Sequence, residues 1–115
     1  MPFVIDLANI FLGKHIEPKL YDLPRQELVF DEDFGQNIVF KYFFGICVAL
    51  EIENTSSTTD LVYTIDSRDG TQITLAPQST KGYDRTQIKS LHIISGDTWK
   101  IRAQIVRFED IISSR

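Results

Sequence analysis

The sequence contains one cysteine, two histidines and no long apolar run, and each of these shortages excludes a class of protein. A lone cysteine, Cys47, cannot form a disulfide within the chain, and its apolar surroundings predict a buried, inert thiol. His15 lies near the start and His92 far along the chain, so neither a zinc site nor a histidine-activated nucleophile is expected. No segment approaches the ~20 apolar residues of a membrane span. We therefore expect no catalysis, no metal or other cofactor and no membrane span.

Basic residues are too few and too scattered to favour nucleic acid. The formal net charge is −4, whereas attraction to phosphates depends on lysine and arginine displacing counterions. The nearest approach to a basic cluster is Lys81, Arg85 and Lys89, with Asp84 among them, and we interpret it as a solvated strand face. The first residues lack the basic n-region of a secretory signal and have Asp6 inside their apolar part, which favours an intracellular origin.

Short rows of alternating apolar and polar residues dominate residues 46–105. This two-residue period is typical of strands that bury one face and expose the other, and turn-forming residues separate the rows at roughly ten-residue intervals, as in sandwiches and barrels. The pattern predicts an all-β fold, a single antiparallel β-sandwich of jelly-roll or immunoglobulin-like type. The five rows are Ile46, Val48, Leu50 and Ile52; Leu61, Tyr63 and Ile65; Ile73 and Leu75; Leu91 and Ile93; and Trp99, Ile101, Ala103 and Ile105.

The clearest local signal is a hairpin between residues 61–65 and 72–75. The loop that joins them contains Asp69-Gly70, a dipeptide favoured where both central residues of a tight turn take positive φ. The polar run over residues 54–60 cannot pack into a core and is predicted to be an exposed loop.

Residues 37–53 form the longest apolar segment, with Tyr42, Phe43 and Phe44 just before Gly45. The segment is long for one strand, so Gly45 indicates a bulge, a bend between two sheets or a break between two strands. Three consecutive aromatic residues place rings on both faces of a strand, of which one enters the core and the other meets the N-terminal arm or another subunit. We therefore predict partner contacts for Tyr42 and Phe44.

An N-terminal arm precedes the sandwich. Phe3, Leu7, Ile10 and Phe11 are spaced as one face of a helix that is too short to be stable alone, so this face needs a surface to lie on. Residues 14–25 contain two prolines and are predicted to be extended. The arm either folds back over an open edge of its own sandwich or reaches a neighbouring subunit, since edges need covering in both cases.

The chain thus divides into an arm over residues 1–25, a sandwich domain over 26–108 and a tail over 109–115. The tail is also apolar, and we predict partner contacts for Ile111 and Ile112. Together, the arm, the aromatic segment and the tail exceed what one small sandwich can bury, and unburied apolar area is usually partner surface. We expect protein partners, either copies of this chain in a homo-oligomer or a larger protein.

A carbohydrate-binding module is the alternative, because sandwiches bind sugars through exposed aromatic rings. Alternation points Tyr63 and Trp99 into the core, which leaves Tyr83, in a predicted loop, as the exposed ring. Tyr83 would act together with the loop over residues 54–60, and it is included among the predicted partner-binding residues.

Four segments follow one another as Asn54-Thr55-Ser56, Leu61-Val62-Tyr63-Thr64-Ile65, Ile73-Thr74-Leu75-Ala76-Pro77 and Ile88-Lys89-Ser90-Leu91-His92-Ile93. Their succession resembles small β-sandwich proteins of bacteriophage and other virus particles. The resemblance implies a non-enzymatic subunit that is repeated on a capsid or tail and joins or decorates neighbouring subunits by arms and loops. It also implies a place in the virion, after assembly in the host cytoplasm, with a larger shell or tail protein as a possible partner.

Overall fold

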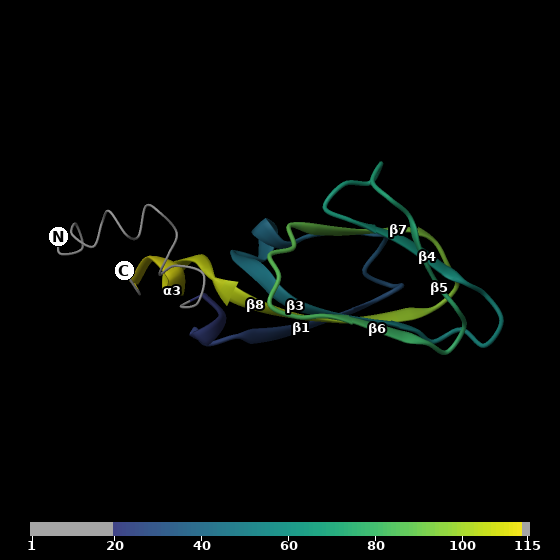
Figure 1. The fold of residues 1–115 in the computed structure, drawn as a ribbon, viewed down its shortest axis with the longest axis horizontal. Helices are drawn as coiled ribbons and strands as arrows, with labels where there is room; N and C mark the ends of the chain where they lie inside the picture. The colour runs from purple at the N-terminus through teal and green to yellow at the C-terminus, as the bar shows by residue number, and fades with distance from the viewer. Residues whose placement is uncertain (1–19, 114–115) are drawn as a thin grey trace.

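The computed structural model describes residues 20–113, which contain eight strands in two antiparallel layers (Figure 1). Sheet A has the strand order β1-β8-β3-β6, and sheet B has the order β2-β7-β4-β5. The prediction of an antiparallel all-β sandwich is confirmed. The strands are β1 (Gln26–Asp31), β2 (Asn37–Val39), β3 (Gly45–Asn54), β4 (Leu61–Ile65), β5 (Ile73–Leu75), β6 (Thr80–Tyr83), β7 (Ser90–Ser95) and β8 (Trp99–Arg107).

The inner strand β8 has the alternation that the sequence predicted. It pairs with β1 on one side and with β3 on the other. Its inward residues are buried between the sheets, and burial of each large apolar side chain contributes roughly 1.5–3 kcal/mol. The core between the sheets is made by Phe30, Ile38, Phe40, Cys47, Leu50, Ile52, Leu61, Tyr63, Ile88, Leu91, Ile93, Trp99, Ile101, Ala103 and Ile105.

The long apolar segment is two strands with a break between them, which was one of the predicted alternatives. A 3-10 helix, η2 (Phe40–Phe43), separates β2 from β3. The prediction that consecutive aromatic residues occupy two faces of one strand is wrong, because these residues lie in this helical turn and at its end. Gly45 then starts β3 close to β8, where a Cβ atom would lie 2.6 Å from the carbonyl oxygen of Val106. Only glycine permits this approach.

A β-bulge interrupts the alternation of β3. The register against β8 shifts between Cys47 and Ala49, which makes Val48 the extra residue. A bulge reverses the faces of the residues that precede it, so Cys47 lies in the core between the sheets while Val48 faces outward from sheet A. The prediction that Ile46 and Val48 share a face with Leu50 is therefore wrong.

Residues 20–23 cover the outward-facing apolar side chains at this bulge. Leu20 and Tyr21 are buried against Val48 and Val106 in a second, smaller core. Residues 20–22 are helical, so the prediction of an extended segment is wrong for this part of the arm. The predicted helix over residues 3–11 lies outside the described residues.

The hairpin of β4 and β5 is confirmed, but its turn differs from the prediction. The residue with positive φ is Asp66, at 69°, whereas Asp69 and Gly70 have ordinary negative φ. The reason is a contact outside the hairpin, since the Asp66 carboxylate accepts the backbone N–H of Lys89 at 2.7 Å. This bond fixes the loop against the segment that leads into β7.

The loop after β3 is less exposed than predicted, because Asn54 and Ser56 are buried. The side-chain amide of Asn54 donates to the carbonyl oxygens of Thr59 (2.8 Å) and Leu75 (3.0 Å), and its oxygen accepts the N–H of Ser56 (3.1 Å). A buried amide with satisfied donors and acceptor is a stable anchor. Thr55 and residues 57–60 form the exposed part of the loop.

The predicted tail begins with a short helix, α3 (Phe108–Ser113), which directly follows β8 (Figure 1). The N–H of Phe108 donates to the carbonyl oxygen of Phe44 at 2.9 Å, so α3 is tied to the end of η2. Within residues 20–113, we find no helix with the length and apolar character that a bilayer crossing requires.

Candidate partner-binding surface

Exposed aromatic side chains gather at the end of the sandwich where β8 leads into α3. Tyr42 and Phe44 are 67% and 74% exposed, and Phe108 is 39% exposed. Together with Phe43 they line a hollow of about 570 Å³, and we call these four residues the aromatic end. Large exposed rings on a small domain mark contact surface more often than isolated apolar residues do. The structure thus brings the predicted residues Tyr42 and Phe44 together.

The backbone of Phe44 is in an unfavourable conformation. Its φ of 61° and ψ of 38° place a phenylalanine in the left-handed region, at a cost of roughly 1–2 kcal/mol. Two hydrogen bonds hold it there, because its N–H donates to the carbonyl of Lys41 (3.0 Å) and its own carbonyl accepts the N–H of Phe108. The side chain gains little burial in return. Such strain is typical of positions where function, rather than stability, selects the residue.

The ring of Phe43, one residue of the aromatic end, packs in a cluster with the rings of Phe30 and Phe34. Phe30 is buried and packs edge-on against Phe34 and Phe43, with ring centroids 4.8 Å and 5.3 Å apart. Phe34 and Phe43 are themselves 6.1 Å apart. Aromatic pairs at these distances add stability beyond their buried area. These contacts anchor Phe43, and with it the turn that carries Tyr42 and Phe44, to the core.

An apolar slot of about 420 Å³ adjoins the aromatic end. The segment over residues 86–89 closes one side of this slot by bridging the two sheets. The N–H of Ile88 donates to the carbonyl of Cys47 (2.9 Å), and the N–H of Phe40 donates to the carbonyl of Lys89 (3.0 Å). The apolar slot is lined by Val39, Phe40, Lys41, Gly45, Ile46, Gln87, Ile88, Lys89, Ser90 and Phe108.

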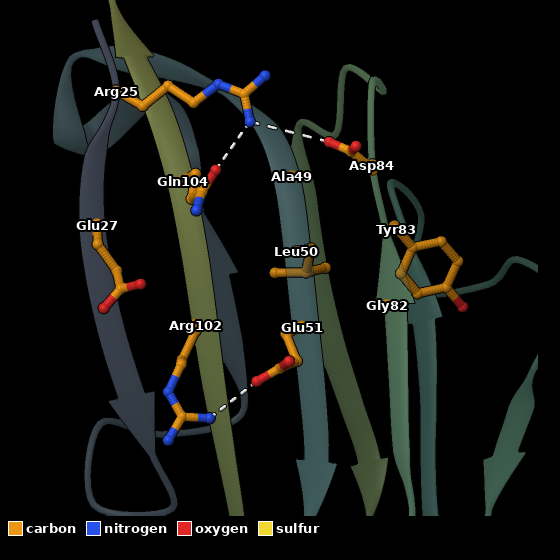
Figure 2. A pocket seen from close by; sticks show the side chains of 10 residues that line it. All are labelled: Arg25, Glu27, Ala49, Leu50, Glu51, Gly82, Tyr83, Asp84, Arg102 and Gln104. Carbon is orange, nitrogen blue, oxygen red and sulfur yellow. Dashed lines mark hydrogen bonds and ion pairs between the residues drawn. The ribbon is translucent and has the colours of Figure 1, made fainter.

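A third hollow, of about 460 Å³, lies on the outer face of sheet A, and we call it the polar groove (Figure 2). Arg102 pairs with Glu51 at 2.9 Å. At the other end of the groove, Arg25 donates to the side-chain oxygen of Gln104 at 2.8 Å and lies 3.8 Å from Asp84. These charged groups are thus already partnered by one another. An incoming ligand would have to replace existing interactions.

Tyr83 is not the exposed loop residue that the sequence predicted. It is on strand β6, it is half-buried, and its hydroxyl forms a 2.8 Å hydrogen bond with the hydroxyl of Tyr63. Burial, together with the Tyr83 hydroxyl, raises the pKa of Tyr63 above its ordinary value. Figure 2 shows the ring of Tyr83 turned away from Arg25 and Glu51. The prediction fails because residue 83 continues the strand and its ring packs against the core.

The other predicted contact residues lie in the C-terminal tail and the N-terminal arm. Ile112 is 67% exposed on α3, whereas Ile111 is half-buried and packs against the core around Leu20. Phe3, Leu7, Ile10 and Phe11 lie outside the described residues.

Two groups considered for chemistry have ordinary structural surroundings. Cys47 is buried as predicted, and burial raises the pKa of its thiol to about 12, so the thiol is protonated at neutral pH. His92 bridges Asn37 (2.8 Å) and Ser90 (3.0 Å) through its two ring nitrogens. In residues 20–113, no three side chains of the metal-binding types His, Cys, Asp and Glu are grouped to hold an ion.

The slot and the groove were not found from the sequence. Val39 and Ile46 have no pattern that distinguishes them from core residues, and the slot is lined by side chains from segments that lie far apart in the sequence. The groove residues Glu51 and Arg102 were recognisable as outward strand positions, but their pairing depends on the register of β3 and β8. Comparison with family models, curated proteins and solved structures found no match for this chain.

Proposed function

We propose that this chain is a non-enzymatic structural subunit of a virus particle that joins neighbouring subunits through its N-terminal arm and its aromatic end. Copies of the chain, or a larger shell or tail protein, are the partners. The observation that carries the proposal is the aromatic end, where the exposed side chains of Tyr42 and Phe44 line one hollow. Aromatic side chains that are held in place and lose their water on contact are the usual hot spots of protein interfaces.

The strand order supports the finer assignment of the fold as a jelly roll. Two facing sheets with the orders β1-β8-β3-β6 and β2-β7-β4-β5 place the first strand beside the last and the second beside the seventh. One long antiparallel hairpin that folds over into two sheets gives this strand order, which contains two Greek-key units over eight strands. Viral capsid domains are among the proteins that use the jelly roll, and lectins are another group.

The strain at Phe44 supports a role for its ring outside the folded domain. Glycine or asparagine would occupy this backbone conformation at lower cost. A phenylalanine that is 74% exposed contributes little to the core, so stability does not explain its presence. A partner that covers the ring would explain it, because burial of one aromatic side chain offsets strain of this size.

The test is the mass of the native chain in solution, measured by sedimentation equilibrium from micromolar to near-millimolar concentration. We expect association that increases with concentration and disappears when residues 1–18 are removed. The truncation must stop before Leu20, because Leu20 and Tyr21 belong to the folded body. A native chain that remains strictly monomeric would contradict self-assembly, and a truncated chain that associates as strongly as the native chain would contradict the role of the arm.

The polar groove favours glycan binding as a second candidate function. It offers the hydrogen-bonding side chains of Arg25, Glu51, Arg102 and Gln104 along one face of a sheet, as sugar hydroxyls require. Tyr83, the ring that this function was predicted to use, lines the groove but is turned away from these polar side chains, with its hydroxyl bonded to Tyr63. A glycan array with the native chain and the Arg102→Ala variant tests this function, and an array without signal removes it.

A further inference from the structure

The apolar slot and the aromatic end are continuous surfaces that share Phe108. In the slot, apolar side chains converge from Val39 at the end of β2, Ile46 at the start of β3 and Phe108 at the start of α3. These elements are fixed by the two sheets, so the slot exists before any partner arrives. A preformed apolar hollow is the usual form of a binding site.

The exposed edge of the slot carries two positive charges, Lys41 and Lys89. Neither ammonium group is ion-paired with a carboxylate of the residues that the structure describes. Lys41 lies 5.4 Å from the ring centroid of Tyr42, and the carboxylate of Asp66 binds the backbone of Lys89 rather than its side chain. The slot therefore suits an apolar segment that carries a negative charge.

Building on the assembly role proposed above, we infer that the slot receives residues 3–11 of a second copy of this chain. This segment is apolar, and its one charged residue is Asp6, between Ile5 and Leu7. Its apolar side chains would fill the slot and continue over the aromatic end, while the Asp6 carboxylate lies near Lys41 and Lys89. Complementary charge of this kind fixes the orientation of a bound segment.

The spacer between this segment and the described chain is long enough to reach a second copy. Leu20 and Ile46 belong to the same outer cluster, and Ile46 also lines the slot. Residues 12–19 separate Phe11 from Leu20, and a spacer of this length spans about 26–29 Å when extended. This length allows residues 3–11 to extend away from their own domain and reach the slot of a neighbouring copy, which the assembly role requires.

Charge exchange on the full chain tests the contact. Lys41→Glu with Lys89→Glu is expected to weaken association about tenfold or more in sedimentation equilibrium, and Asp6→Lys in the same chain is expected to restore it. The matched control is Lys81→Glu with Lys100→Glu, which makes the same change in net charge away from the slot and should not be rescued by Asp6→Lys. Equal weakening by both pairs, or no rescue, would overturn the inference.

Cross-linking identifies the source of the segment. A full chain with Leu7→Cys and an isotope-labelled full chain with Gln87→Cys are mixed and oxidised, and we expect a disulfide-linked pair that contains one chain of each mass. Glu27→Cys, an exposed position in the polar groove, is the control for random collision. The native Cys47 is buried in every chain. A single chain with both substitutions that closes on itself in excess native chain would overturn the inference.

The two proposals fail in distinguishable ways. If the copies associate but charge exchange and cross-linking do not give the expected results, the slot does not bind residues 3–11, while the assembly role stands. If the native chain does not associate at all, self-assembly fails, and the inference fails with it.

Discussion

The aromatic end and the polar groove are hollows of comparable size, about 570 Å³ and 460 Å³, on one small sandwich. They differ in whether their side chains already have partners. In the groove, the arginines are bound to neighbouring carboxylates and an amide, whereas the rings of Tyr42 and Phe44 are mostly exposed to water. Apolar surface left in water is a source of binding free energy, while paired surface charges contribute little to it. The comparison teaches that a surface whose side chains lack partners is a better candidate for protein binding than a hollow of similar volume whose charges are already paired.

The largest expected effect is the loss of stability when residues 20–25 are removed. Of the two hollows, only the groove is lined by a residue of this segment, Arg25. Removing residues 1–25 uncovers Val48 and Val106 and deletes Arg25, so we expect the free energy of unfolding to fall by at least about 3 kcal/mol. Removing residues 1–18 keeps Leu20, Tyr21 and Arg25, so the decrease should be smaller. Urea unfolding followed by circular dichroism measures both. Equal stability of the two truncated chains would show that Leu20 and Tyr21 do not cover the sheet as described.

The next effect concerns association. The combination of Tyr42→Ser with Phe44→Gly removes both rings without straining the backbone, and we expect dissociation constants to rise about 100-fold, since two hot-spot side chains typically contribute more than 1 kcal/mol each. Val29→Ser, which removes an exposed apolar side chain of β1, is the matched control and should change little. If both variants weaken association equally, the aromatic end is not the interface.

A smaller effect, on the free energy of unfolding alone, is expected at Phe44. Phe44→Gly relieves the left-handed strain, and we expect it to raise the free energy of unfolding by about 1 kcal/mol. Tyr42→Ala, at an equally exposed site without positive φ, should stay within about 0.5 kcal/mol of the native chain. Thermal unfolding of monomeric samples compares the two. A destabilising Phe44→Gly would mean that the ring does more for the fold than its exposure indicates.

The smallest effect is expected in the groove. Arg102→Ala removes the contacts with Glu51 and Glu53, which lie at 2.9 Å and 3.6 Å on an exposed face, and should cost about 0.5 kcal/mol. High salt should reduce the difference further, because it screens exposed charges. Unfolding measured at low and high salt provides the check. A loss of several kcal/mol would place this arginine among the structural determinants of the fold.

Much of the fold could be predicted because burial follows the two-residue period. Trp99 to Ile105 alternates without interruption, and the structure places its inward residues in the core as expected. The period gave the wrong face for Ile46 and Val48, since a bulge changes the phase without a signal in composition. Likewise, the burial of Asn54 depends on a carbonyl of Leu75, which lies far away in sequence.

The candidate site was only partly predictable for a related reason. Tyr42 and Phe44 were identified because three consecutive aromatic residues exceed what one strand can bury. Tyr83 was misplaced because a polar, glycine-containing stretch resembles a loop, although β6 forms there by pairing with β3. The slot could not be predicted, since its lining comes from three segments that lie far apart in the sequence, and their meeting has no local sequence signature.

The direction of β3 has a practical consequence for fusion proteins. This strand runs from Gly45, beside the aromatic end, to Asn54, and its ten residues place the loop over 57–60 about 30 Å away. A purification tag at the carboxyl end would follow α3 and crowd Phe108. An epitope or fluorophore inserted at Ser57 or Thr58, beyond the anchored amide, would leave that end free.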